Sequence, residues 1–161
     1  MKGLTPPYSH QAHRAAELQK RTEPQSYRTS EKANVAEIRA ATDLIVYQKA
    51  YALAMEIFRL SKGWPPEEKY SLTDQIRRSS RSVCANLREG WSKRRYEAHF
   101  ISKLTDADGE NSETATWLDF ARDCGYLDPP DYTRLADLCK EVGSMLGAML
   151  FAPAPFLLKL S

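Results

Sequence analysis

Glycine is scarce in this sequence, and long apolar runs are missing. Only seven of the 161 residues are glycine, whereas alanine, leucine, arginine and glutamate are frequent. Because glycine weakens helices and those four residues favour them, the composition predicts an all-α fold. No apolar run reaches the ~18 residues that a membrane span needs, and the N-terminus lacks the apolar core of a signal peptide. We therefore expect a cytoplasmic protein with no membrane partner.

Cysteine is also sparse and shows no ligand spacing. The three cysteines are Cys84, Cys124 and Cys139, an odd number without a C-x-x-C pair. This count argues against a disulfide framework and against a zinc site. We interpret all three as small buried residues of a protein in a reducing compartment.

Motifs for catalysis are missing as well. The sequence has no glycine-rich phosphate loop, no H-E-x-x-H pair and no nucleophile elbow. His99, beside Phe100, is interpreted as structural. Asp106, Glu110 and Glu113 share one helical stripe, but carboxylate bundles that hold two metals add Glu-x-x-His motifs, which this sequence lacks. We therefore predict a protein without enzymatic activity, cofactor or metal.

Four amphipathic segments separated by short links predict an antiparallel up-down four-helix bundle. The segments begin near Asp43, Ser71, Arg95 and Asp131, and a chain of this length suits one domain. We assign the bundle to residues 42–151. Residues 1–41, with three prolines, are expected to form an N-terminal extension that is flexible or folds on a partner, and 152–161 an apolar C-terminal tail. Asn111 is predicted to place a polar layer in the third helix.

The second segment organises the sequence. Ser71 is expected to cap its helix, with Asp74 completing a capping box, and Gly90 to end it. At ~100° per residue, the apolar side chains form one narrow stripe between two polar ones. The first polar stripe contains three arginines: Arg77, Arg81 and Arg88. The second, predicted to form a polar network between helices, contains Gln75, Ser82, Asn86 and Glu89.

Residues 75–90 resemble the signature of the four-helix bundle proteins known as 23S rRNA intervening-sequence proteins. The matching positions are Gln75-Ile76-Arg77-Arg78, Ser82-Val83 and Asn86-Leu87-Arg88-Glu89-Gly90. The third segment matches as well, at Phe100, Leu104, Ala107, Gly109, Glu113, Thr114, Ala121-Arg122 and Gly125-Tyr126-Leu127. Ser79 and Arg88 replace the family's alanines, and Cys84 stands where proline is frequent. The resemblance implies a four-helix bundle that assembles as a homo-oligomer, with five subunits the family's expected number.

The resemblance also implies two candidate partners. The family's reading frames lie within rRNA intervening sequences, and a related group serves as accessory proteins of reverse transcriptases in diversity-generating retroelements. RNA or DNA is therefore one expected partner, and a reverse transcriptase is another. The alternative is a protein-interaction scaffold with no nucleic-acid binding.

Charge is small in sum but uneven along the chain. The net charge is +2, yet residues 77–95 hold seven basic residues against one acid, and 106–128 hold seven acids against one arginine. A basic edge of this kind can bind a phosphate backbone. Its candidate contacts are Arg77, Arg81, Arg88, Lys93, Arg94 and Arg95. The alternative is that these cations form ion pairs with the acidic stripe of the third helix.

Overall fold

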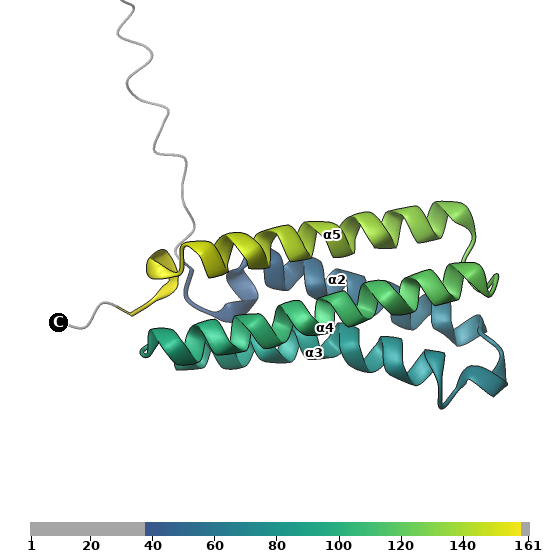
Figure 1. Cartoon of the computed structure of the whole chain (residues 1–161), viewed down its shortest axis with the longest axis horizontal. Coiled ribbons are helices and arrows are strands. Elements are labelled where there is room, and N and C mark those ends of the chain that lie inside the picture. Colours follow the sequence, from purple (N-terminus) through teal and green to yellow (C-terminus); the bar gives the residue numbers. More distant parts are fainter. Residues whose placement is uncertain (1–37, 159–161) are drawn as a thin grey trace, which may run out of the picture. The chain divides into compact units, whose positions relative to one another are not determined.

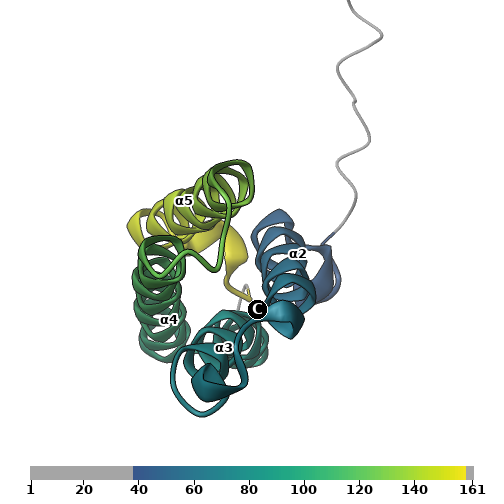
Figure 2. The same ribbon diagram turned by 90° about the vertical axis from the view of Figure 1, so that its right-hand side faces the viewer.

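The computed structural model describes residues 38–158. Four long α-helices, α2 (Ile45–Leu60), α3 (Leu72–Lys93), α4 (Glu97–Asp123) and α5 (Pro129–Phe151), run antiparallel to their neighbours (Figure 1). Viewed from its end, the bundle places α3 between α2 and α4, and α5 closes the ring (Figure 2). The predicted all-α bundle is confirmed for this part of the chain. The predicted flexible extension lies almost entirely outside the described residues.

Short 3-10 helices fill the links and ends. η2 (Ala41–Asp43) precedes α2, η3 (Ser61–Gly63) and η4 (Pro66–Glu68) link α2 to α3, and η5 (Ala154–Phe156) follows α5. The described part of the C-terminal tail, residues 152–158, packs against the bundle through Phe156 and Leu157. The Phe156 ring lies 6.3 Å from the Phe100 ring, and the Leu158 amide donates to the Arg94 carbonyl at 3.2 Å. The tail thereby covers part of the core between α3 and α4.

Two predicted helix boundaries were wrong. α3 does not end at Gly90 but continues to Lys93. Gly90 has no side chain, which lets α4 approach here: a Cβ at Gly90 would lie 3.2 Å from Lys103 Cβ. Helix α5 begins at Pro129, not after the two prolines, and Asp128 is its cap, accepting from the Asp131 amide at 2.8 Å. Proline suits the first helical turn, where its missing N–H has no intrahelical acceptor.

The start of α3 also differs from the predicted capping box. The Ser71 side chain forms no cap hydrogen bond, and its hydroxyl donates to the Glu68 carboxylate instead. Glu68 also accepts from the Leu72 amide at 3.4 Å, so this carboxylate replaces the predicted cap. These hydrogen bonds lower the pKa of Glu68. By contrast, Gly125 follows the end of α4 in the left-handed conformation that glycine favours, with φ at 76°.

A buried polar layer separates two apolar clusters in the core. One cluster surrounds Phe100 near the tail, and the other surrounds Ile76 and Leu118 near the α2–α3 link. Between them, the Thr114 hydroxyl donates to Ser79 Oγ at 2.9 Å. Asn111 Nδ2 donates to the Cys139 carbonyl at 3.0 Å, which is the polar layer expected from Asn111.

The cysteines do not all lie in this core. Cys84 and Cys139 are buried, and burial raises the pKa of each thiol to about 11. Cys124 is exposed, contrary to the prediction, because it lies at the C-terminal cap of α4, beyond the apolar stripe of that helix.

The polar layer gives a prediction for stability. Thr114→Val removes the donor to Ser79 inside a site where both side chains are fully buried, so unfolding free energy should fall by about 1–3 kcal/mol. Thr116→Val is the matched control, since the exposed Thr116 hydroxyl bonds only the Ser112 carbonyl of its own helix. Equal effects of the two substitutions in urea unfolding would contradict a stabilising role for the layer.

Candidate nucleic-acid interface

Three of the four arginines of α3 lie over aromatic rings of α2. The guanidinium carbons of Arg77 and Arg81 are 5.1 and 5.5 Å from the centre of the Phe58 ring, and that of Arg88 is 5.9 Å from the Tyr47 ring. Arg81 and Arg88 are exposed, and Arg77 is half-buried. Within residues 38–158, none of the three forms an ion pair with a carboxylate. Aromatic faces attract cations without neutralising them, so this edge keeps its positive charge.

The other three predicted contacts lie at the C-terminal end of α3. Arg94 Nη1 donates to the Trp91 carbonyl at 2.6 Å, and its guanidinium lies 4.0 Å from the Trp91 ring. Lys93 is 3.9 Å from Glu89, and Arg95 is exposed. Carbonyl groups at a helix C-terminus favour nearby cations. The structure therefore places Lys93, Arg94 and Arg95 together at the C-terminal end of α3. It places Arg77, Arg81 and Arg88 along one side of this helix.

The predicted polar network lies on the opposite side of α3, facing α4. Lys103 of α4 donates to Asn86 Oδ1 at 3.3 Å and pairs with Glu89 at 3.0 Å. Gln75 accepts from Arg78 at 3.1 Å, while half-buried Ser82 has no hydrogen bond in the described part of the chain. Gln75, Asn86 and Glu89 thus have charged partners, and no two of the four predicted residues are hydrogen-bonded to each other within residues 38–158.

The acidic stripe of α4 belongs to this same seam. Asp106 pairs with Lys103 at 3.1 Å, and Glu113 lies 3.9 Å from Arg78. Hydrogen bonds that Lys103 donates to Glu89 and Asp106 raise the pKa of Lys103, and partial burial, with the charge of Glu113, raises that of Glu110. Asp106 and Glu113 are therefore paired with cations of this seam, whereas Glu110 has no ion pair within residues 38–158. The arginine edge, formed by Arg77, Arg81 and Arg88, faces α2. Among the described residues, no cluster of three His, Cys, Asp or Glu is arranged to hold a metal.

Comparison with known proteins places this bundle in a family. The model of the 23S rRNA-intervening sequence protein matches residues 42–148. The chain belongs to this family. A solved structure from Bacteroides thetaiotaomicron, a protein of unknown function from the S23 ribosomal protein family, is 29% identical to it. The similarity covers 67% of this chain and 96% of that one, with a TM-score of 0.61. No curated protein matches the chain.

The match to the family model covers all of α2, α3 and α4 and most of α5. The arginine edge and the α3–α4 seam both lie inside the matched region. None of the helices within residues 38–158 is long and apolar enough to cross a membrane.

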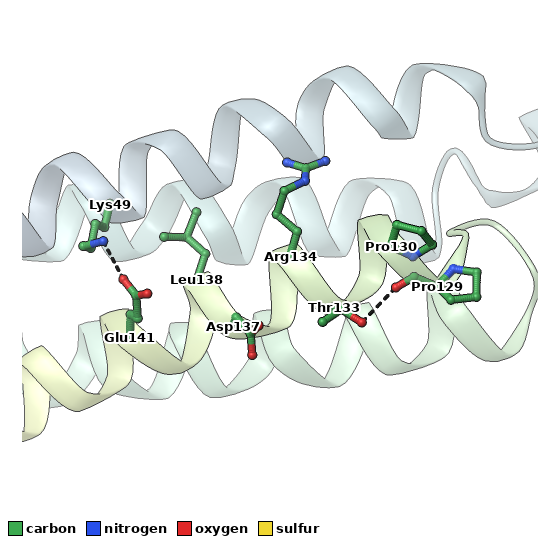
Figure 3. A pocket seen from close by; sticks show the side chains of 8 residues that line it. All are labelled: Lys49, Pro129, Pro130, Thr133, Arg134, Asp137, Leu138 and Glu141. Carbon is green, nitrogen blue, oxygen red and sulfur yellow. Dashed lines mark hydrogen bonds and ion pairs between the residues drawn. The ribbon is translucent and has the colours of Figure 1, made fainter.

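A groove between α2 and α5 offers no comparable chemistry. Figure 3 shows its floor, where Lys49 pairs with Glu141 at 2.5 Å and the Thr133 hydroxyl donates to the Pro129 carbonyl at 2.9 Å. Arg134 pairs with Glu56 of α2 and with Asp131 of its own helix. The three charged side chains Lys49, Arg134 and Glu141 of this groove are thus paired, and their exposure makes such pairs weak. The uncompensated arginine edge is the better candidate site.

The aromatic partners of the arginines were not identified from the sequence. Tyr47 and Phe58 share the helical spacing of the apolar residues of the first helix, although both are only partly buried. A signal was present: Tyr47 and Phe58 are 11 residues apart, as are Arg77 and Arg88, and antiparallel helices pair such positions in reverse order. The sequence could not show which neighbouring helix the arginine stripe faces.

The two seams give opposite expectations for stability. Lys103→Gln should lower the melting temperature more than Arg81→Gln, because it leaves Asp106 without a cation and Glu89 with only Lys93, 3.9 Å away. Arg81→Gln leaves no carboxylate unpaired and removes a positive charge from a positive edge. Thermal unfolding of both variants at low salt tests this, and the reverse order would show that the arginine edge is a stabilising element.

Proposed function

We propose that this intervening-sequence protein is a non-enzymatic, self-associating bundle that binds RNA or DNA through the phosphate backbone. The contacts are Arg77, Arg81, Arg88, Lys93, Arg94 and Arg95. One observation carries the proposal: three arginines lie along one side of α3 without a carboxylate partner among the described residues. Asp106 and Glu113 of the acidic stripe pair instead with Lys103 and Arg78.

Arginine suits this task because its planar guanidinium presents several N–H donors to phosphate oxygens. The aromatic rings hold the guanidinium groups over the surface of α2 without using up their charge. Contacts of this kind go to phosphate and not to base edges, so binding should depend steeply on salt and little on sequence. The proposal places the protein in the cytoplasm, and the family resemblance adds a reverse transcriptase as a protein partner.

Self-association is supported by apolar side chains at one end of the bundle. Ile45 at the start of α2, Tyr96 before α4 and Phe151 at the end of α5 are 63%, 60% and 93% exposed. Exposed aromatic and aliphatic groups at one end favour contact between subunits. Five subunits, the number that the family resemblance implies, would repeat the arginine edge around a closed assembly. A protein-interaction scaffold would use the same exposed end without binding nucleic acid.

Loss of two arginines should weaken nucleic-acid binding. Arg81→Ala with Arg88→Ala should reduce affinity for RNA and DNA and lower the slope of log K against log salt by roughly one per lost contact. Both side chains are exposed, so the fold should survive. Fluorescence anisotropy across a salt series measures both quantities.

The matched control removes two positive charges elsewhere. Lys69→Ala with Lys140→Ala changes the net charge equally, and both lysines are exposed and outside the arginine edge. Equal losses of affinity in the two double variants would show that the effect comes from net charge alone. A wild-type protein that binds no nucleic acid at low salt would favour the scaffold.

The exposed end gives the prediction for assembly. Light scattering should give a mass of five times the 18.3 kDa of one chain, and Phe151→Asp should reduce it, because a charge at the contact is costly to bury. Tyr70→Asp, at the opposite end and 82% exposed, is the control and should leave the mass unchanged. A wild-type monomer at micromolar concentration would contradict self-association.

A further inference from the structure

The surface where α2 meets α3 alternates cations with aromatic rings. We call this surface the arginine–aromatic seam and define it by Tyr47, Tyr51, Phe58, Lys62, Arg77, Arg81 and Arg88. The three rings recur on one side of α2, since positions 47, 51 and 58 lie within ~40° of one another at helical spacing. Each arginine lies over one of these rings, so the seam combines positive charge with planar apolar groups.

Three cations converge on the ring of Phe58. Lys62 Nζ lies 4.7 Å from the ring centre, and the guanidinium carbons of Arg77 and Arg81 lie 5.1 and 5.5 Å from it. None of the three has a carboxylate partner within residues 38–158. Arg77 Nε donates to Ser61 Oγ at 2.7 Å, which fixes the side chain while leaving its terminal NH₂ groups for a ligand. Like charges gathered at one point favour an anion there, and phosphate matches guanidinium geometry.

The other end of the seam carries an exposed ring. The Tyr51 side chain is 53% exposed and lies nearly parallel to Tyr47, with ring centres 6.3 Å apart and planes 16° apart. Arg88 lies over Tyr47. Tyr51 thus offers a planar apolar surface beside a cation. Seven residues separate Tyr51 from Phe58, ~10 Å along the helix, which spans about three nucleotides at the 3.4 Å spacing of stacked bases.

We propose that the seam binds single-stranded nucleic acid, with a phosphate at the Phe58 cations and a base stacked on Tyr51. The inference rests on the proposed function and names the form of nucleic acid that the same edge takes. A single strand can turn an unpaired base onto an aromatic ring, whereas the base faces of a duplex are already stacked on one another. A duplex can therefore use the cations of the seam but not its exposed ring.

The test compares a 20-nucleotide fluorescent oligothymidine with a duplex of equal length, in RNA-free buffer at two salt concentrations. The wild-type protein should bind the single strand at least about tenfold more tightly than the duplex, because each stacked base adds affinity. Tyr51→Leu should remove about tenfold of the single-strand affinity and leave duplex binding unchanged. Lys62→Gln should weaken both and lower both salt slopes.

The matched control is Tyr70→Leu. Tyr70 is 82% exposed and also has a lysine beside its ring, with Lys69 Nζ at 5.0 Å, but it lies outside the seam. This variant should bind both ligands as the wild type does. Circular dichroism and light scattering on each variant separate a loss of binding from a loss of fold or assembly.

The outcomes distinguish this inference from the proposed function. The single-strand inference is overturned if the two ligands bind equally, or if Tyr51→Leu leaves the single-strand affinity unchanged. In either case, salt-dependent binding of the duplex would still support the phosphate contacts. A changed oligomeric mass in Tyr51→Leu also overturns it, since the ring would then contact a second copy of the chain. Absence of binding to either ligand at low salt overturns both.

Discussion

The rotation of α3 about its own axis is the constraint on which this structure depends, and a buried hydrogen bond fixes it. Ser79 and Thr114 are 35 residues apart, fully buried, and joined at 2.9 Å between α3 and α4. Asn111 extends the layer by bonding the Cys139 carbonyl of α5. A rotated or shifted helix would bury these polar groups without partners, at a cost of about 1–3 kcal/mol each. The layer therefore selects one register between the two apolar clusters.

Charge segregation follows from that register. In this register, Ser79 and Gly90 face α4. The seam between α3 and α4 therefore contains Glu89 and Lys103, and acidic side chains of α4 form ion pairs there. The arginine stripe is then directed to α2, whose facing side carries aromatic rings and no acid that pairs with it. One helix thus presents a neutralised side and a positive side. This separation gives an edge whose charge stays available to a polyanion.

Much of the fold could be predicted from spacing within single helices. The stripes of α3, the polar role of Asn111 and the turn at Gly125 each depend on local periodicity or on local backbone conformation. The boundary at Gly90 was wrong because the same glycine that can end a helix can also admit a neighbouring helix. The exposure of Cys124 was missed because residue type alone does not place a side chain beyond the end of a stripe.

The site was harder to predict, because spacing shows which residues share a stripe but not which helix faces them. Arg77, Arg81 and Arg88 could be assigned to one face of α3, and Asn86 with Glu89 to another. Their partners could not: the ion pairs expected for the arginine stripe fall instead to Lys103 and Arg78, and the rings of Tyr47 and Phe58 take their place. Contacts between helices distant in sequence decide this, as they do for Ser79 and Thr114.

The arginine side chains themselves provide the most direct test of the phosphate interface. In NMR spectra of the arginine Nε–H groups, titration with a short oligonucleotide should shift the signals of Arg77, Arg81 and Arg88. Arg122 and Arg134, which are paired with Asp119 and Asp131, should keep their positions. Equal shifts at all five arginines, or none at the arginine edge, would contradict an interface built on the uncompensated charge of α3.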